Sequence, residues 1–166
     1  MVFLPGILLI LALGSSSVTS TTFYWNSTLQ CDNASGLWCA QWHFWEKDSI
    51  TQDNKIVSSR LNCTTSKVNS FETVGDYEST IIAFLETSYY PYGILLHDCD
   101  KNKQVRKAVI HFYPVEKKLF KHKYDVELNV SGLGENVTDF YEYCGTWGRL
   151  TDAECNVILQ RKSFDQ

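Results

Sequence analysis

Residues 23–31 (FYWNSTLQC) alternate in polarity: every second side chain from Phe23 to Cys31 is mostly apolar, and those between them are mostly polar. Residues 124–130 (YDVELNV) alternate in the same way. A period of two is that of a β-strand, whose successive side chains point to opposite faces. Both stretches are therefore predicted to be half-buried strands, with Asn26 and Asn129 on the solvent side.

Further strand patterns, separated by short polar turns, lie between and beside these two stretches. Residues 38–45 (WCAQWHFW) are bulky on both faces, which predicts a central strand. Other predicted strands are residues 80–85, 93–97 and 108–113. The single helix signal is a capping box at Thr151 to Glu154, which predicts a short C-terminal helix over residues 152–162. The pattern indicates an all-β fold, an antiparallel sandwich or small barrel.

The length and composition predict one folded domain with a removable leader. The chain has 166 residues, of which 44% are hydrophobic and 20% charged, so a buried core is expected and disorder is not. An apolar run over residues 3–13 is too short to span a membrane and is typical of a signal peptide, with cleavage after Ser20. We expect a signal peptide over 1–20, a β-sandwich domain over 21–131 and a cysteine-containing extension over 132–166.

Cysteines and glycosylation sequons both predict a secreted, extracellular protein. Six cysteines follow the predicted leader, an even number that suits disulfide pairing in the secretory pathway, although six allow 15 connectivities. They are Cys31, Cys39, Cys63, Cys99, Cys144 and Cys155. Five Asn-Xaa-Ser/Thr sequons stand at Asn26, Asn33, Asn62, Asn129 and Asn136.

No residue pattern points to catalysis, a metal or a cofactor. The four histidines are far apart in the sequence, and His43, His97 and His111 fall within predicted strands, where packing is commoner than catalysis. The loop at residues 98–103 starts like a calcium loop, but Lys103 stands where an EF-hand needs glycine, and Val109 where it needs glutamate. A non-enzymatic protein is therefore expected, with no transmembrane segment.

Positive charge is concentrated between residues 101 and 123. This segment has eight basic residues and one acidic residue, whereas the rest of the chain has 7 basic and 18 acidic residues. The basic residues are Lys101, Lys103, Arg106, Lys107, Lys117, Lys118, Lys121 and Lys123. Such a segment can bind anionic lipid or sulfated glycan, while the overall acidity argues against nucleic acid. The alternative is a solvated pair of strands whose lysines protect a sheet edge.

Several sequence blocks resemble the nematode transthyretin-like family. They are Leu29-Gln30-Cys31 with Phe44-Trp45-Glu46-Lys47-Asp48, then Phe71-Glu72-Thr73-Val74-Gly75, and above all Tyr92-Gly93-Ile94-Leu95-Leu96-His97-Asp98-Cys99 followed by Ile110-His111-Phe112-Tyr113-Pro114. The chain departs from the family where a second cysteine usually follows Cys99, so Cys99 needs another partner. Cys39, Cys63, Cys144 and Cys155 also look like additions.

The resemblance implies a prealbumin-like antiparallel β-sandwich that is exported and not an enzyme. Some relatives bridge phosphatidylserine on dying cells to a receptor, which implies a role at cell surfaces or in extracellular fluid. A competing resemblance is Gly36-Leu37-Trp38, which matches the Gly-x-Trp near the start of lipocalins. It would instead imply a closed barrel that carries a small apolar ligand.

Overall fold

The computed structural model describes residues 20–48, 52–78 and 87–137. The chain forms strands and no helix within these ranges. One sheet has three strands in the order β10-β1-β5: β10 (Lys121–Asn129), β1 (Ser20–Gln30) and β5 (Val68–Glu78). The predicted all-β fold is confirmed.

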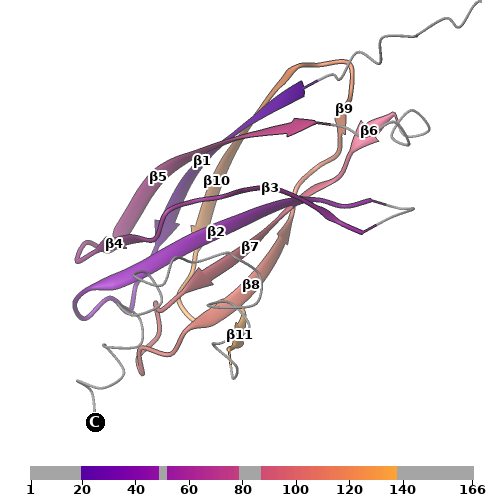
Figure 1. The fold of residues 1–166 in the computed structure, drawn as a ribbon. Coiled ribbons are helices and arrows are strands. Elements are labelled where there is room, and N and C mark those ends of the chain that lie inside the picture. The colour runs from indigo at the N-terminus through magenta and orange to yellow at the C-terminus, as the bar shows by residue number, and fades with distance from the viewer. Residues whose placement is uncertain (1–19, 49–51, 79–86, 138–166) are drawn as a thin grey trace, which may run out of the picture.

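The second sheet has six strands and lies opposite the first (Figure 1). Its order is β11-β8-β7-β2-β3, with β4 also paired to β2. The strands are β2 (Trp38–Glu46), β3 (Asn54–Ser58), β4 (Asn62–Thr64), β7 (Pro91–His97), β8 (Arg106–His111) and β11 (Glu135–Asn136). A small third sheet pairs β6 (Ser88–Tyr89) with β9 (Val115–Glu116).

The core between the sheets is filled by aromatic rings. Phe23 and Trp25 on β1 face Trp42 and Phe44 on β2, and all four side chains are fully buried. Tyr89 covers one side of this cluster, with its ring 5.6 Å from that of Phe23. The period-two pattern of residues 23–31 and 124–130 thus assigns the inner and outer faces correctly, because alternate side chains on β1 and β10 are buried.

The sandwich has two distinct ends. The disulfide end contains the turn from β1 to β2 and the loop from β7 to β8, which are joined by the Cys31–Cys99 disulfide. The β6–β9 end contains the small third sheet and the turn through which the chain enters β10 (Figure 1). The nine-residue β10 runs from the second end to the first, a length of about 30 Å at roughly 3.4 Å per residue.

The sheets are not purely antiparallel, which corrects the prediction. Strand β1 pairs with β5 in antiparallel fashion but with β10 in parallel, for example with Trp25 opposite Tyr124. The reason is the path of the chain, which leaves β9 at the same end at which β1 begins, so that β10 must run in the direction of β1.

Several predicted segments cannot be compared with the structure, and several observed strands were not predicted. The predicted leader up to residue 19, the predicted strand over 80–85 and the predicted helix over 152–162 lie outside the described residues. Residues 135–136, from the predicted extension, form β11 and pair with β8. The sequence did not predict the long strand β5 or the short strands β3, β4, β6 and β9.

Candidate functional site

The two most buried histidines occupy structural positions. His43 on β2 has its Nδ1 2.6 Å from the hydroxyl of Ser58 on the neighbouring strand. His97 at the end of β7 has its Nε2 3.1 Å from the carbonyl oxygen of Leu133. Burial lowers the pKa of His97 to about 4. The ring is therefore neutral at pH 7, donates from Nε2 to that carbonyl, and leaves Nδ1 without a partner among the described residues.

The other two histidines differ in burial. His122 packs beside Phe23, with ring centroids 5.2 Å apart, and burial lowers its pKa as well. His111 is exposed on β8 with its ring 5.7 Å from that of Tyr92. Within the described ranges no three of the His, Cys, Asp and Glu side chains are grouped so as to hold a metal ion.

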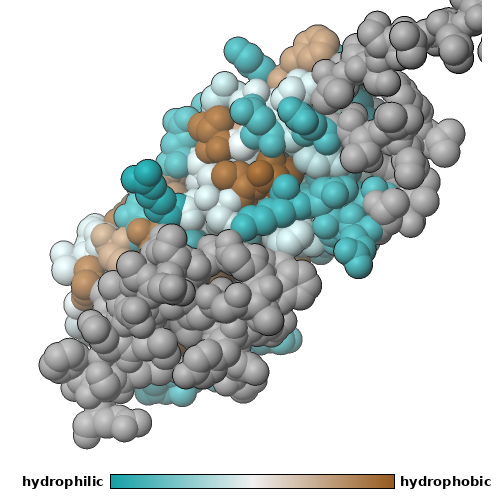
Figure 2. Space-filling view, viewed as in Figure 1, coloured by the Kyte–Doolittle hydropathy of each residue, from teal (hydrophilic) through white to brown (hydrophobic). Residues whose placement is uncertain are grey.

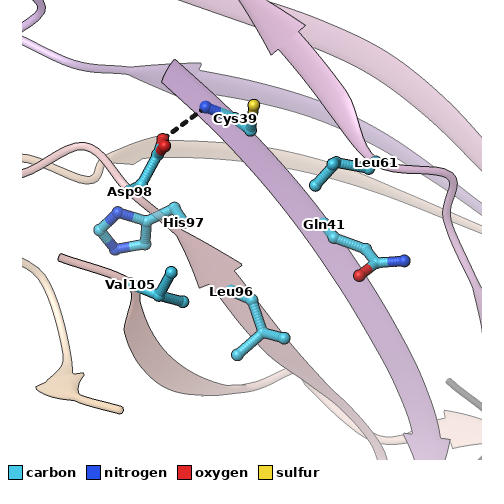
Figure 3. Close-up of a pocket in the computed structure, with 7 residues that line it drawn as sticks. All are labelled: Cys39, Gln41, Leu61, Leu96, His97, Asp98 and Val105. Atoms are coloured by element: carbon cyan, nitrogen blue, oxygen red, sulfur yellow. Dashed lines mark hydrogen bonds between the residues drawn. The ribbon is translucent and has the colours of Figure 1, made fainter. Parts of the chain in front are cut away.

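A small recess of about 20 Å³ lies beside the Cys39–Cys63 disulfide (Figure 3). Gln41 lines it from β2, while Leu96, His97 and Asp98 come from the end of β7. The carboxylate of Asp98 accepts a hydrogen bond of 2.6 Å from the backbone nitrogen of Cys39. Asp98 therefore ties β2 to the end of β7, whereas Gln41 donates to the carbonyl oxygen of Ser59 and His97 bonds to that of Leu133.

The loop that resembled the start of a calcium site uses its carboxylates internally. Asp100 accepts hydrogen bonds from the backbone nitrogen of Asn102 at 2.8 Å and from Arg106 at 3.0 Å. These donors lower the pKa of Asp100, the backbone hydrogen bond from Asn102 being the largest cause. Lys103 adopts a left-handed backbone, with φ of 53°, at the position where an EF-hand has glycine.

The fold separates the eight basic residues into two groups. Lys101, Lys103, Arg106 and Lys107 lie at the disulfide end, in the β7–β8 loop and the start of β8. Lys117, Lys118, Lys121 and Lys123 lie at the β6–β9 end, in the turn before β10 and its first residues. The continuous basic segment of the sequence therefore does not make one continuous surface.

The two groups differ in how their charges are used. At the disulfide end, Arg106 pairs with Asp100 at 3.0 Å and also donates to the carbonyl oxygens of Leu133 and Gly134. At the β6–β9 end, Lys118 and Lys121 are exposed and form no ion pair with any described residue. The nitrogen of Lys123 lies 3.5 Å from Asp125, and that of Lys117 lies 5.1 Å from the centre of the Tyr89 ring. The second group is the stronger candidate for binding anions.

Two apolar residues at the β6–β9 end were not predicted from the sequence. Leu119 and Phe120 stand in the turn before β10 with 58% and 63% of their surface exposed. The available signal was a pair of large apolar residues between lysines, in residues 116–123 (EKKLFKHK). In the aromatic run of residues 89–92, Tyr89 is buried and the hydroxyl of Tyr92 donates to Asp53, whereas Tyr90 is 48% exposed.

Four of the six cysteines form two disulfides. Cys31–Cys99 connects the end of β1 in one sheet to the end of β7 in the other, which gives Cys99 the partner it needed. Cys39–Cys63 connects the adjacent strands β2 and β4. Cys144 and Cys155 lie outside the described residues.

The sequon asparagines gather toward one end of the molecule. Asn33, Asn62, Asn129 and Asn136 are at the disulfide end, in the β1–β2 turn, at the start of β4, at the end of β10 and in β11. Asn26 is in the middle of β1 on its outer face, where its amide donates to Asp125. No sequon of the chain falls in the turn at the β6–β9 end.

Comparisons with known proteins place the chain by family and not by activity. No curated protein and no solved structure matches it. One family profile matches residues 26–140, a range that starts within β1 and includes strands β2 to β11. The chain therefore belongs to the family described as Caenorhabditis elegans protein of unknown function (DUF870).

Proposed function

We propose that this chain is a secreted, non-enzymatic binding protein that attaches to anionic surfaces through the lysines at its β6–β9 end. The observation that carries the proposal is the exposure of Lys118 and Lys121 without an acidic partner among the described residues. Each lysine near an anionic membrane surface contributes roughly 1 kcal/mol of attraction at ordinary salt.

Export is supported by the disulfides and the sequons. Two disulfides are compatible with an oxidising, extracellular setting. The asparagines of three sequons, Asn33, Asn129 and Asn136, are exposed, as carriers of glycans must be. Within the described ranges no helix has the length and apolar composition needed to cross a membrane.

We further propose that the fold is a transthyretin-like sandwich. Two facing sheets enclosing an aromatic core support this, as does the place of the resembling blocks. Residues 92–97 form most of β7, Cys99 follows two residues after its end, and residues 71–75 lie within β5. Attachment to a cell-surface receptor, which the resemblance also implies, stays a prediction.

Carriage of an apolar ligand inside a lipocalin-like barrel has less support. The described strands form separate sheets with Trp25, Trp42 and Phe44 filling the space between them. Trp38 of the Gly-x-Trp match is buried, and its indole nitrogen donates to the carbonyl oxygen of Ser66.

Vesicle co-sedimentation of the purified secreted protein tests anionic-surface binding. We expect recovery with phosphatidylserine-containing vesicles and little with neutral phosphatidylcholine vesicles. Raising the salt from about 0.1 M to about 1 M should release the protein, because the screening length falls from roughly 10 Å to roughly 3 Å. Equal recovery with both vesicle types at low salt contradicts the proposal.

A pair of matched variants tests which lysines are responsible. Lys118→Ala with Lys121→Ala should weaken binding by about 2 kcal/mol, or about thirtyfold. Lys101→Ala with Lys103→Ala removes the same charge at the disulfide end and should have little effect. A larger loss of vesicle binding in the Lys101/Lys103 variant would place the binding surface at the disulfide end and contradict the proposal.

A further inference from the structure

Leu119 and Phe120, the apolar pair at the β6–β9 end, are exposed to solvent and take no part in the core. Leu119 and Phe120 are 58% and 63% exposed, whereas the alternating residues His122, Tyr124 and Val126 that follow in β10 are buried. Exposed apolar side chains occurring singly are ordinary, but two large ones side by side at a turn make an apolar projection. At this end, in the upper part of Figure 2, hydrophobic surface lies beside strongly hydrophilic surface.

The backbone that carries the pair is held in place by hydrogen bonds on each side. The nitrogen of Leu119 donates to the carbonyl oxygen of Glu116 at 3.3 Å, which closes the turn. The carbonyl oxygen of Phe120 accepts from the nitrogen of Thr22 on β1 at 2.9 Å, and the nitrogen of Lys117 donates to the carbonyl oxygen of Thr87 at 3.0 Å. The pair is thus presented by ordered backbone, so that burying it costs little further conformational entropy.

The charges around the pair are those that an anionic bilayer attracts. Lys117 and Lys118 precede the two apolar residues, and Lys121 and Lys123 follow them, with Glu116 the one acidic residue of the segment. Long lysine side chains can keep their ammonium groups among lipid headgroups while adjacent apolar side chains enter the acyl region. A sulfated glycan would use the lysines but would leave Leu119 and Phe120 in water.

The positions of the sequons indicate which end of the molecule can face a membrane. Four of the five asparagines lie at the disulfide end, about 30 Å along β10 from the turn at the rate of roughly 3.4 Å per residue. A glycan is bulky and hydrophilic and keeps the surface that carries it in water. The β6–β9 end is therefore the end that can approach a membrane closely.

We propose that Leu119 and Phe120 insert into the interface of an anionic phospholipid bilayer, with the flanking lysines on the headgroups and the disulfide end directed away from the membrane. This rests on the proposed anionic-surface function and adds the partner, a lipid bilayer, and the orientation on it. Two side chains give shallow, reversible attachment, because binding strength follows the apolar area buried together with the electrostatic attraction.

The first experiment compares apolar truncations at the two ends of the purified full-length protein. Leu119→Ser with Phe120→Ser keeps every charge and should lower the partition onto phosphatidylserine-containing vesicles by about tenfold or more, through lost apolar burial. The matched control is Leu37→Ser, because Leu37 is a 46% exposed leucine in the turn at the disulfide end. The control should bind like the unaltered protein.

The second experiment reads insertion directly and does not depend on affinity. Phe120→Trp places an indole at the turn, and its fluorescence is obtained by subtracting the spectrum of the unaltered protein. With anionic vesicles this difference emission should shift to shorter wavelength. Lipids brominated on the acyl chain should quench it. Leu37→Trp should show neither change. Sedimentation of the unaltered protein without vesicles reports whether the pair instead forms a contact between two copies.

The outcomes separate this inference from the function on which it rests. Salt-sensitive vesicle binding that survives the serine substitutions, with no shift for Phe120→Trp, overturns insertion but leaves anionic-surface binding intact. If the unaltered protein binds neither anionic vesicles nor heparin, both proposals are overturned. Binding to heparin that is equal in the unaltered and serine-substituted proteins, without vesicle binding, assigns the lysines to a glycan. Self-association abolished by the serine substitutions, with unchanged vesicle binding, assigns the pair to a dimer contact.

Discussion

The ring of Trp25 on β1 stacks on the ring of Phe44 on β2, with centroids 4.0 Å apart and planes inclined by 9°. These strands belong to different sheets, so this single pair spans the interior of the sandwich. The stack continues from Phe44 to Trp42 at 5.2 Å and from Trp25 to Tyr124 at 6.1 Å. Contact between the two sheets therefore depends on a set of stacked aromatic rings.

Truncating this pair should be costly. Trp25→Ala removes a fully buried ring and leaves a cavity between the sheets, for which about 3–5 kcal/mol of unfolding free energy is expected to be lost. Urea denaturation followed by circular dichroism measures it. Val109→Ala on β8, where Val109 is 48% exposed, is the control and should change stability by less than about 0.5 kcal/mol. Similar losses in both variants would contradict the assigned core.

Gly93 makes room for the same rings. A Cβ atom at Gly93 would lie 2.7 Å from Cζ3 of Trp42 and 3.2 Å from Cε1 of Phe44, closer than packed atoms normally approach. Gly93→Ala should therefore destabilise the protein by about 1–3 kcal/mol, as overpacking does.

Gly132→Ala separates this crowding from backbone strain. Gly132 has φ of +75° but nothing within 4 Å of its added Cβ, so only a cost of roughly 1–2 kcal/mol for the left-handed backbone is expected. Adding Trp42→Leu should relieve part of the loss in Gly93→Ala and none in Gly132→Ala. Thermal denaturation of the unaltered protein, the three single variants and the two double variants provides the comparison. Simple additivity of the Gly93 and Trp42 changes would refute the packing explanation.

The two disulfides should differ in their contribution to stability. Cys31–Cys99 joins residues 68 apart and connects the two sheets, whereas Cys39–Cys63 joins residues 24 apart within one sheet. On chain entropy alone, replacing both cysteines of the first pair by serine should cost about 1 kcal/mol more than replacing those of the second. Denaturation of the two double variants measures this difference, and non-reducing peptide mapping verifies the pairing. The reverse order would mean that native contacts outweigh the entropy of the unfolded chain.

The sequence predicted the strands in which alternation coincides with strong hydrophobic contrast. In β1 and β10 the inward residues are large and apolar, so the pattern was visible. In β5 the buried positions include Asn69, Thr73 and Gly75, while Val68 and Val74 are about half exposed. The hydrophobic residues of β5 therefore do not mark its buried face. Asn69 can be buried because its side-chain amide donates a hydrogen bond to the carbonyl oxygen of Asn62. That strand could not be found from hydrophobic periodicity.

The candidate site was predicted in part. The sequence located the basic residues but could not show that the β7–β8 hairpin and the β9–β10 turn lie at opposite ends, because that depends on strand directions. Nor could it show that Arg106 is engaged by Asp100 while Lys118 and Lys121 are exposed. Leu119 and Phe120 fall between two predicted strands, and their exposure becomes visible only once the turn that carries them is known.

The stability of the protein should fall in mildly acidic solution because of His97. Burial lowers its pKa to about 4, below the ordinary value of 6.5, while Arg106 also lowers it and Asp100 and the carbonyl of Leu133 raise it. Between pH 6.5 and 4 the unfolded chain therefore binds a proton that the folded protein does not. The stabilisation is complete above pH 6.5 and is lost as the pH falls toward 4, by up to about 3 kcal/mol.

His97→Gln isolates this contribution. Glutamine can still donate to the carbonyl oxygen of Leu133 but does not titrate, so its unfolding free energy should depend less on pH between 7 and 4 than that of the unaltered protein. His111→Gln is the matched control, because it makes the same substitution at an exposed histidine. Urea denaturation at a series of pH values provides both profiles. Carboxylates titrate in the same pH range and contribute to the stability of all three proteins, so the informative quantity is the difference between their pH profiles. Parallel profiles for the unaltered protein and His97→Gln would show that this buried ring has no part in the acid sensitivity.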